Sequence, residues 1–449
     1  MAYIAPFRAL RYDPSRVDPN KAITQPYDKI TPQMQAGYYE ASPYNLVRII
    51  LGRREPDQES DNVYTRAAGF FRGWRRDGIF LQDTQPSLYA YSQRFTVPGS
   101  DADHERRGFI GLGRVEDYSK GIVFRHEQTL SKPKADRLEL LRATRAHFGQ
   151  IFMLYSDAGE VDSLLAPASA PDIKVTDEYD VQHRVWKVSD RSLIELIRGK
   201  MKDKKLIIAD GHHRYETALN YRNERRAAAQ AVVTGAPRQR SSTAALLETS
   251  EPEDAPYEMV MMTFVNMNSP GVVILPTHRV VHGLVSFSSN DFLKQARGYF
   301  NVEEVDISVD AARATGLLKE AGRAGTALLA VLPDRDLLLH TPRANGRLFQ
   351  GLSLRQQALD VVQLHKVILE TVLGLSQESI RNQENLTYVR DTAEAIGRVR
   401  SGGANAAFLM NPVRMEQVRD IAFGGEVLPQ KSTDFYPKLL SGLTIYALD

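Results

Sequence analysis

The 449-residue sequence contains no cysteine. This absence excludes disulfide bonds, thiolate catalysis and cysteine-ligated zinc or iron–sulfur sites. Long hydrophobic runs are also absent. One of the longest, residues 327–332, is far too short to cross a bilayer, so we expect no membrane span. The N-terminal residues lack a charged segment followed by an apolar one, so we expect no signal peptide. Together these absences predict a cytoplasmic protein.

A strong net charge is missing as well. The chain has 57 basic and 55 acidic residues, for a formal net charge of +2. Because proteins that bind a DNA duplex usually concentrate a basic excess, nucleic acid is not the expected partner. No G-x-G-x-x-G motif opens a helix after a strand, so nothing supports a dinucleotide-binding fold. The remaining composition, 43% hydrophobic and 25% charged, is that of an ordinary globular protein.

The chain is long enough for two or three domains. From about residue 288, helix-like and strand-like segments alternate, which favours a mixed or parallel α/β sheet. We predict a mixed α/β (α+β) fold with an N-terminal region, 1–287, and a C-terminal α/β region, 288–449. In the first region we expect a strand at 45–51, a helix at 62–78, a hairpin of strands at 88–97 and 107–115, a strand at 150–155 and an exposed loop at 226–256. In the second we expect helices at 290–300, 309–321, 355–373, 391–400 and 413–423, and strands at 302–307, 326–332, 336–341, 386–390, 405–410 and 442–448.

Polar chemistry is densest in residues 206–217, where an apolar run meets an Asp-Gly pair and a helix-like pattern follows. This pattern predicts a strand, a tight turn and a helix. The first turn of a helix presents N–H groups and the positive end of the helix dipole. His212, His213 and Arg214 add side-chain donors at the same turn. The segment therefore predicts a site for phosphate or another anion.

A structural interpretation stays open for this turn. Asp210 would then be the N-cap of a solvated helix. Three cationic or titratable residues at a dipole end that repels cations favour the functional interpretation instead. A metal site made by His212 and His213 alone is not expected, because adjacent helical side chains point roughly 100° apart.

A second polar concentration spans residues 124–137, where Glu127 stands beside His126 and several basic residues follow. A carboxylate with nearby cations could supply a general base and neutralise transferred charge. A polar loop leading into an amphipathic helix, with Leu141 and Phe148 inward, explains the same residues equally well.

Three further places carry candidate residues. Asp28 follows a Pro-Tyr pair and is either a site carboxylate or a turn former. His278 and Arg279 come at the end of an expected strand, where a structurally satisfied histidine is the alternative. Lys431-Ser432 follows a glycine pair but does not match the phosphate-loop pattern. A cation-bearing loop that closes over a site and a plain surface loop both remain open there.

Five motifs occur in an order that resembles a bacterial family known as domain of unknown function 1015. They are Gln25-Pro26-Tyr27-Asp28, His126-Glu127-Gln128-Thr129, Asp210-Gly211-His212-His213-Arg214, Leu275-Pro276-Thr277-His278-Arg279 and Pro429-Gln430-Lys431-Ser432-Thr433. The Asp-Gly-His-His-Arg element is similar to the core of the ParB/sulfiredoxin superfamily, which includes free-serine kinases. The resemblance implies such a core at about residues 115–285, with an additional C-terminal region.

The resemblance also implies residue roles. Glu127 would be the base on the substrate hydroxyl, and Asp210 would position substrate or a Mg²⁺ ion. With His213, these form the predicted catalytic set. The predicted phosphate- and substrate-binding set is His126, Thr129, Gly211, His212, Arg214, His278, Arg279, Lys431, Ser432 and Asp28. The sulfiredoxin reaction itself is excluded, because it needs a cysteine.

These observations lead to three hypotheses. The first is a phosphotransferase similar to the free-serine kinases, acting on a small hydroxyl-bearing metabolite such as L-serine, with ATP, ADP or pyrophosphate as donor. The second is a nucleotide-binding switch or slow nucleotide phosphohydrolase, in which Glu127 has only a structural role. The third, a ParB-like nucleic-acid enzyme, conflicts with the charge balance. The sequence leaves the formation of homo-oligomers open.

Overall fold

The computed structural model describes residues 1–128, 131–166, 169–233, 255–306, 309–343 and 346–449. It is mixed α/β, with 35% helix and 25% strand, which confirms the predicted fold class. Two compact units are present. Unit 1 comprises Met1–Arg125, Thr129–Val273 and Pro437–Asp449, and unit 2 comprises His126–Gln128 and Ile274–Tyr436.

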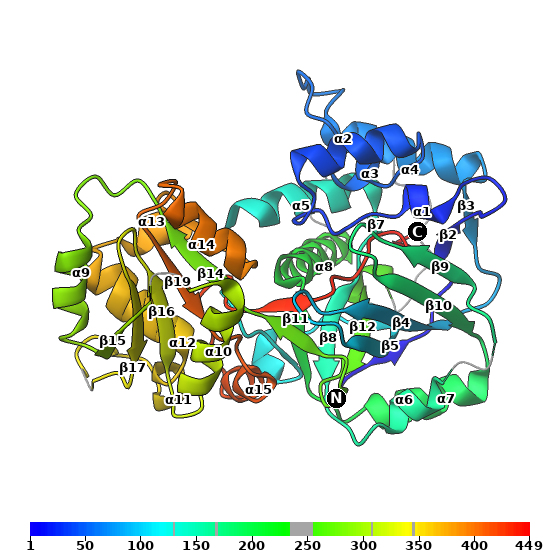
Figure 1. Cartoon of the computed structure of the whole chain (residues 1–449). Coiled ribbons are helices and arrows are strands. Elements are labelled where there is room, and N and C mark those ends of the chain that lie inside the picture. The colour runs from blue at the N-terminus through cyan, green and yellow to red at the C-terminus, as the bar shows by residue number, and fades with distance from the viewer. Residues whose placement is uncertain (129–130, 167–168, 234–254, 307–308, 344–345) are drawn as a thin grey trace. The chain divides into compact units, whose positions relative to one another are not determined.

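The division into units differs from the predicted boundary after residue 287, which falls inside unit 2. Pairing between distant segments is the reason. In unit 2 the Leu428 N–H donates to the His126 carbonyl at 2.7 Å. In unit 1 the C-terminal strand β21 (Tyr446–Ala447) pairs with β7 (Ala146–His147) and returns the chain end to this unit (Figure 1).

Unit 1 is built on a mixed sheet with the order β6-β11-β8-β12-β5-β4-β10-β9, to which β1 adds beside β5. The β11–β6 and β12–β8 pairs are parallel, and the other pairs are antiparallel. The strands are β1 (Ile4–Ala5), β4 (Leu88–Thr96), β5 (Asp103–Arg114), β6 (Val123–Phe124), β8 (Ile151–Tyr155), β9 (Ile173–Thr176), β10 (Gln182–Val188), β11 (Leu206–Asp210) and β12 (Met259–Asn266). A small separate sheet pairs β2 (Leu10–Tyr12) with β3 (Phe80–Gln82).

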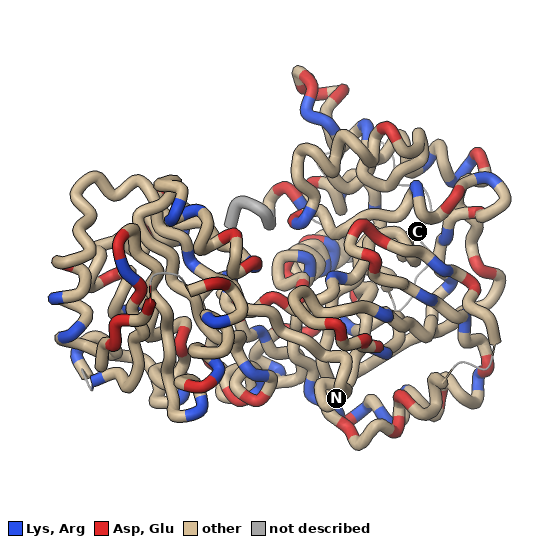
Figure 2. Tube along the Cα trace, in the orientation of Figure 1, with Lys and Arg blue, Asp and Glu red and all other residues tan. Residues whose placement is uncertain are grey.

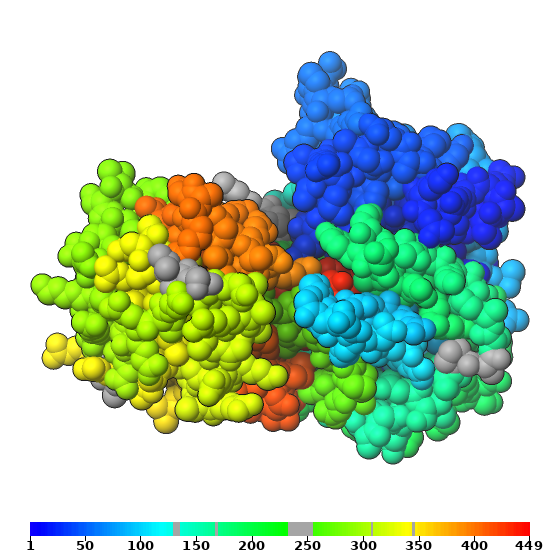
Figure 3. All heavy atoms as spheres, in the orientation of Figure 1, coloured from blue at the N-terminus to red at the C-terminus, as the bar shows by residue number. Residues whose placement is uncertain are grey.

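The helices of unit 1 pack on this sheet and on one another. They are α1 (Pro19–Ala22), α2 (Pro32–Ala41), α3 (Val47–Ile50), α4 (Val63–Arg76), α5 (Ser131–Thr144), α6 (Glu160–Leu164), α7 (Arg191–Met201) and α8 (His212–Val233). Tyr215 of α8 and Ile197 of α7 share one buried cluster with the apolar residues of β8, β11 and β12. The space-filling view shows the N-terminal segment, in blue, packed directly on later segments of unit 1 (Figure 3).

Unit 2 contains a six-stranded sheet with the order β15-β17-β16-β19-β14-β18. Its strands are β14 (His278–Val281), β15 (Asn301–Val305), β16 (Ala327–Val331), β17 (Asp336–His340), β18 (Leu386–Val389) and β19 (Ala406–Met410). One face is covered by α10 (Ala311–Ala321) and α14 (Thr392–Arg400). The other elements are α9 (Ser289–Ala296), α11 (Leu354–Gln357), α12 (Asp360–Gln363), a π-helical segment (Leu364–Val372), α13 (Gln377–Asn382), α15 (Met415–Phe423) and the short strands β13 (Val273–Leu275) and β20 (Asp434–Tyr436).

Several local predictions were wrong. Residues 45–51 contain the helix α3 rather than a strand, and Asn45 Oδ1 accepts a hydrogen bond from the Val47 N–H at its start. Every pair in the unit 2 sheet is antiparallel, whereas a mixed or parallel sheet was expected. The expected loop at 226–256 begins instead as the end of α8, and residues 234–254 lie outside the described residues.

Charges are distributed rather than concentrated. Figure 2 shows Lys and Arg interspersed with Asp and Glu along both units, in agreement with the near-zero net charge. Among the residues that the structure describes, no helix is both long and apolar enough to cross a membrane.

Candidate functional site

In unit 1, the predicted anion turn connects the buried strand β11 to the 22-residue helix α8. Gly211 has a φ of 91°, a left-handed conformation that glycine adopts without steric cost. Its carbonyl accepts the first helical hydrogen bond, from the Tyr215 N–H at 2.9 Å, so Gly211 occupies the N-cap position. Asp210 precedes the cap, and its Oδ1 accepts a hydrogen bond from the Gly211 N–H at 2.9 Å. The structural alternative with Asp210 as N-cap is therefore wrong.

Arg214 folds back over this turn. Its Nη2 lies 3.7 Å from Asp210 Oδ2, and its Nη1 donates to the carbonyl of Gln150. A Cβ at position 211 would lie 3.1 Å from the Arg214 guanidinium. Gly211 is thus required both for the backbone turn and for the close approach of Arg214.

Basic side chains surround the Asp210 carboxylate. Lys438 Nζ lies 3.6 Å from Asp210 Oδ2. Burial alone would raise the pKa of Asp210, but the charges of Lys438, Arg214 and Lys29 hold it well below its ordinary value. Asp210 is therefore ionised at neutral pH, inside a group of cations that outnumbers it.

A buried arginine adds to this positive region. The Arg106 guanidinium lies over the Phe152 ring, 4.7 Å from its centroid, and donates to Gln93 and to the carbonyl of Pro437. Burial lowers the pKa of Arg106 to about 10, which still leaves it charged at neutral pH, and the Asp210 charge partly offsets the burial.

The surroundings of Asp210, the predicted Mg²⁺ ligand, do not suit a resident metal ion. The prediction places Mg²⁺ on Asp210, a second carboxylate that it does not name, and the phosphates. The nearest charged partners of Asp210, Arg214 and Lys438, would repel a divalent cation. Across the described residues, no group of three or more His, Asp or Glu side chains could hold a metal ion. No chemical step is therefore assigned to a metal held by this chain.

The other residues predicted in the same region have defined places. Asp28 is exposed and lies in the turn that contains Tyr27 and Lys29, and its role as a site carboxylate stays a prediction. The His212 side chain is buried and its charge acts on Asp210. The His213 carbonyl accepts a hydrogen bond from the Thr217 hydroxyl at 2.8 Å.

In unit 2, Glu127 is anchored to Thr433. Glu127 Oε1 accepts hydrogen bonds from the Thr433 backbone N–H and hydroxyl, both at 2.8 Å. The His126 Nε2 atom lies 2.8 Å from the same hydroxyl oxygen. Because the hydroxyl hydrogen goes to the carboxylate, Nε2 must be the donor in this second bond. The three side chains form one directed chain of hydrogen bonds.

Arg279 supports the same loop from another direction. It is fully buried, and its Nη2 donates to the carbonyl of Lys431 at 3.1 Å and lies 3.3 Å from His365 Nε2. Burial lowers the pKa of Arg279 to about 10. Lys431 has a φ of 58°, a left-handed conformation that is strained for lysine, and its side chain is exposed. Glu127 and Arg279 thus hold the backbone around an exposed lysine.

The remaining predicted residues divide between structural roles and undescribed positions. His278 Nδ1 accepts from the Met410 N–H at 3.3 Å, and its Nε2 lies 3.0 Å from the Thr392 hydroxyl. Burial lowers the pKa of His278 to about 4, so it is a neutral, satisfied core histidine. The Ser432 hydroxyl donates to the carbonyl of Pro429 at 2.6 Å. Thr129 lies outside the described residues.

The predicted residues therefore fall into two groups, one in each unit. Unit 1 brings together the Asp210–Arg214 turn and Asp28, and unit 2 brings together His126, Glu127, Arg279, Lys431 and Ser432. Sequence reasoning missed Arg106, Lys29 and Lys438 around Asp210. Lys29 directly follows one of the five motifs and Lys438 lies five residues after another, which was an available signal. Arg106 lies inside a strand with no local signal.

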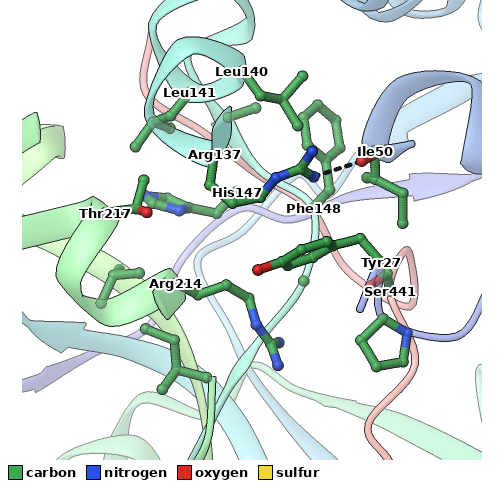
Figure 4. A pocket seen from close by; sticks show the side chains of 15 residues that line it. Tyr27, Ile50, Arg137, Leu140, Leu141, His147, Phe148, Arg214, Thr217 and Ser441 are labelled. Atoms are coloured by element: carbon green, nitrogen blue, oxygen red, sulfur yellow. Dashed lines mark hydrogen bonds between the residues drawn. The ribbon is translucent and has the colours of Figure 1, made fainter. Parts of the chain in front are cut away.

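A cleft in unit 1 adjoins the Asp210–Arg214 turn. It encloses about 590 Å³, including its open mouth, and Arg214 is one of its lining residues. Figure 4 shows Tyr27 between Arg137 and Arg214 in this cleft. The Arg137 guanidinium lies 4.2 Å from the centroid of the Tyr27 ring. We refer to this space as the Tyr27 cleft.

Three solved structures are among those similar to this chain. One is a conserved hypothetical protein from Pyrococcus furiosus, 13% identical, covering 73% of this chain and 92% of that one with a TM-score of 0.35. Another is a free serine kinase in complex with AMP, 14% identical, covering 72% and 89% with a TM-score of 0.33. The third is SbnI from Staphylococcus aureus with a C-terminal truncation, 9% identical, covering 75% and 87% with a TM-score of 0.35. At these values the likenesses assign no role to any residue.

Comparison with curated proteins gives no match. The sequence profile of one family matches residues 4–362, which is most of the chain and includes the Asp210–Arg214 turn, His126-Glu127 and His278-Arg279. The family resemblance that the five motifs suggested is confirmed by this match. The chain belongs to the family described as "Protein of unknown function (DUF1015)".

Proposed function

We propose that this protein is a phosphotransferase that acts on a small hydroxyl-bearing metabolite, with L-serine as the first acceptor to test. The donor would be ATP, ADP or pyrophosphate. The observation that carries the proposal is the Asp210–Arg214 turn at the start of α8, with Lys438 and Lys29 beside it. The positive end of a long helix and a local excess of cations are the features that bind a phosphoryl group.

The balance of charge supports an anionic ligand at this turn. Lys29, Arg106, Arg214 and Lys438 all act electrostatically on or with Asp210. The exposed Asp28 acts on the neighbouring Tyr27, and the four cations outnumber these two carboxylates. A phosphate would neutralise that excess, and in a half-buried site the interaction is stronger than in water.

In this proposal, the predicted base, Glu127, takes the proton of the acceptor hydroxyl. The hydroxyl oxygen then bonds to the terminal phosphorus of the donor, and the bond from that phosphorus to its bridging oxygen breaks. The bridging oxygen leaves with the electron pair on the shortened donor. Glu127 Oε1 already accepts two hydrogen bonds from Thr433, so Oε2 is the oxygen assigned to the proton.

Phosphorus NMR tests the proposal. The full chain would be incubated with serine and, in separate samples, ATP, ADP or pyrophosphate, each with and without added Mg²⁺. We expect a phosphoserine signal with at least one donor, and a loss of at least tenfold in rate for Arg214→Gln. The matched control is Arg72→Gln, because Arg72 is an exposed arginine of the same unit. Absence of phosphoserine with every donor rules out serine as the acceptor, and a panel of other small alcohols then tests the reaction class.

A second function is favoured by one observation. The Glu127–Thr433 hydrogen bonds would give Glu127 a purely structural role, holding the loop that carries Lys431. The protein would then be a nucleotide-binding switch, or would hydrolyse its nucleotide slowly. Thermal stabilisation by a nucleotide, with no further effect of any acceptor and no transferred phosphate, supports this alternative over the first.

A further inference from the structure

The Tyr27 cleft has a wall of aromatic and aliphatic side chains. Tyr27, His147 and Phe148 contribute rings, and Leu140, Leu141 and Val260 contribute aliphatic surface. This lining suits a flat, mostly apolar group rather than a small zwitterion.

The charged residues of the lining also favour such a ligand over a free amino acid. The described residues that line the cleft include two guanidiniums, from Arg137 and Arg214, and no carboxylate. Burial lowers the pKa of His147 to about 4 and raises the pKa of Tyr27 to about 12, so both are neutral at physiological pH. A free amino acid would find no counter-charge here for its ammonium group. An uncharged ring attached to an anion fits both the apolar lining and the two guanidiniums.

Arg214 belongs both to the cleft and to the anion turn. Its Nη2 approaches Asp210, while its side chain lines the cleft beside Gly149 and Ser441. A Cβ at position 149 would lie 3.0 Å from the Ser441 hydroxyl oxygen and 3.5 Å from Arg214 Nη1. The absence of a side chain at Gly149 therefore keeps this junction open. A ligand that fills the cleft and reaches Arg214 has its anionic end at the turn.

Tyr27 is the central side chain of the cleft (Figure 4). The Arg137 guanidinium lies against its ring, and Arg137 is itself fixed because its Nη1 donates to the Ile50 carbonyl at 2.5 Å and its Nε donates to Asp136 at 2.8 Å. The charges of Arg137 and Arg214 both act on Tyr27. A rigid aromatic ring held in this way is a surface on which a planar base can pack.

We propose that the Tyr27 cleft binds the planar base of a nucleoside phosphate whose phosphates lie at Arg214. This inference rests on the proposed function for the phosphate site, and it selects a nucleotide over pyrophosphate as the phosphate-bearing ligand. Stacking on an aromatic side chain strengthens the binding of a base by about one order of magnitude or more. The base should therefore add at least about tenfold to the affinity of the phosphates alone.

Isothermal titration calorimetry with ADP, pyrophosphate and adenosine tests this inference without any turnover. We expect ADP to bind at least ten times more tightly than pyrophosphate. Tyr27→Leu should weaken ADP about tenfold and change the affinity for pyrophosphate less than threefold, whereas Arg214→Gln should weaken both ligands. Tyr179→Leu is the matched control, because Tyr179 is an exposed tyrosine of unit 1 outside the cleft.

The outcomes separate the two proposals. Equal affinities for ADP and pyrophosphate, an unchanged ADP affinity in Tyr27→Leu, or no ADP binding would each overturn the base site. Thermal unfolding of Tyr27→Leu checks that the variant is folded, and Tyr27→Phe, which keeps the ring, should restore ADP binding. ADP binding of the expected pattern without phosphoryl transfer keeps the base site and contradicts the phosphotransferase. Phosphoryl transfer from pyrophosphate without ADP binding would keep the phosphotransferase and contradict the base site.

Discussion

Glu127 Oε1 accepts two hydrogen bonds from a single residue, Thr433, through its backbone N–H and its hydroxyl. The two residues are separated by 306 positions in the sequence. This contact ties the His126–Gln128 segment to the loop that carries Lys431, and it gives Glu127 a structural role whether or not it also takes a proton.

Two substitutions of Glu127 separate these roles. Glu127→Gln can keep both hydrogen bonds through its amide oxygen, but it cannot act as a base. If Glu127 is the base, turnover falls by roughly 10²–10⁴-fold while the melting temperature stays close to that of the wild type. Glu127→Ala removes the hydrogen bonds as well and should lower the free energy of unfolding by about 1–3 kcal/mol. Glu416→Gln, an exposed glutamate of unit 2, is the control. Full turnover in Glu127→Gln would remove the base assignment.

Gly211→Ala should destabilise the protein and weaken phosphate binding. The φ of 91° is unfavourable for alanine, and the new Cβ would lie 3.1 Å from the Arg214 guanidinium. We expect a loss of about 1–3 kcal/mol in the free energy of unfolding and a displaced Arg214. Gly199→Ala is the matched control, because Gly199 lies in α7 with open space around its Cβ position and should gain up to about 1 kcal/mol. Urea unfolding measures the stability and phosphate titration measures the affinity. Equal stability of Gly211→Ala and Gly199→Ala would contradict the requirement for glycine at position 211.

Asp210→Asn should strengthen the binding of pyrophosphate in the absence of metal. The substitution removes the negative charge that Arg214 and Lys438 now contact, so their charge becomes available to the ligand. We expect a severalfold gain in affinity that decreases at high salt. Calorimetry with and without Mg²⁺ makes the measurement. If the variant instead loses affinity only when Mg²⁺ is present, Asp210 binds the metal that accompanies the ligand.

Asp360 should make unit 2 less stable as pH rises. Burial raises the pKa of Asp360 to about 7, from an ordinary value of 3.8. Between these values the folded state holds a proton that the unfolded state releases, so the free energy of unfolding falls as pH rises from about 4 to 7 and then levels off. Asp360→Asn should remove this decrease, which amounts to a few kcal/mol at most. Urea unfolding at pH 5, 6, 7 and 8 tests it, with the exposed Asp420→Asn as control. Parallel pH profiles for wild type and Asp360→Asn would show that the carboxyl titrates normally.

Local sequence patterns predicted several elements well. The helix expected at 62–78 is α4 (Val63–Arg76), because its apolar residues recur at helical spacing and Asn62 forms a capping box with Thr65. The strands at 88–97 and 107–115 are β4 and β5. By contrast, the apolar run at 45–51 has no period that distinguishes a short helix from a strand, and the structure contains α3 there. The helix expected at 355–373 is divided into α11, α12 and a π-helical segment.

The sequence by itself determined the strand, turn and helix around Asp210 and Gly211. An apolar strand, an Asp-Gly pair and a following helix are local features, and their chemistry is set by backbone geometry within a few residues. The family membership also follows from the sequence.

Tertiary structure alone decided which residues surround that turn, and which unit contains the other predicted site residues. Lys438 reaches Asp210 from 228 positions away in the chain, and Arg106 comes from the middle of a strand. His126 and Glu127 join unit 2 because Leu428 and Thr433 pair with them. Such contacts depend on the path of the whole backbone. Neither the excess positive charge around Asp210 nor the hydrogen bonds of Glu127 with Thr433 could therefore be derived from local sequence.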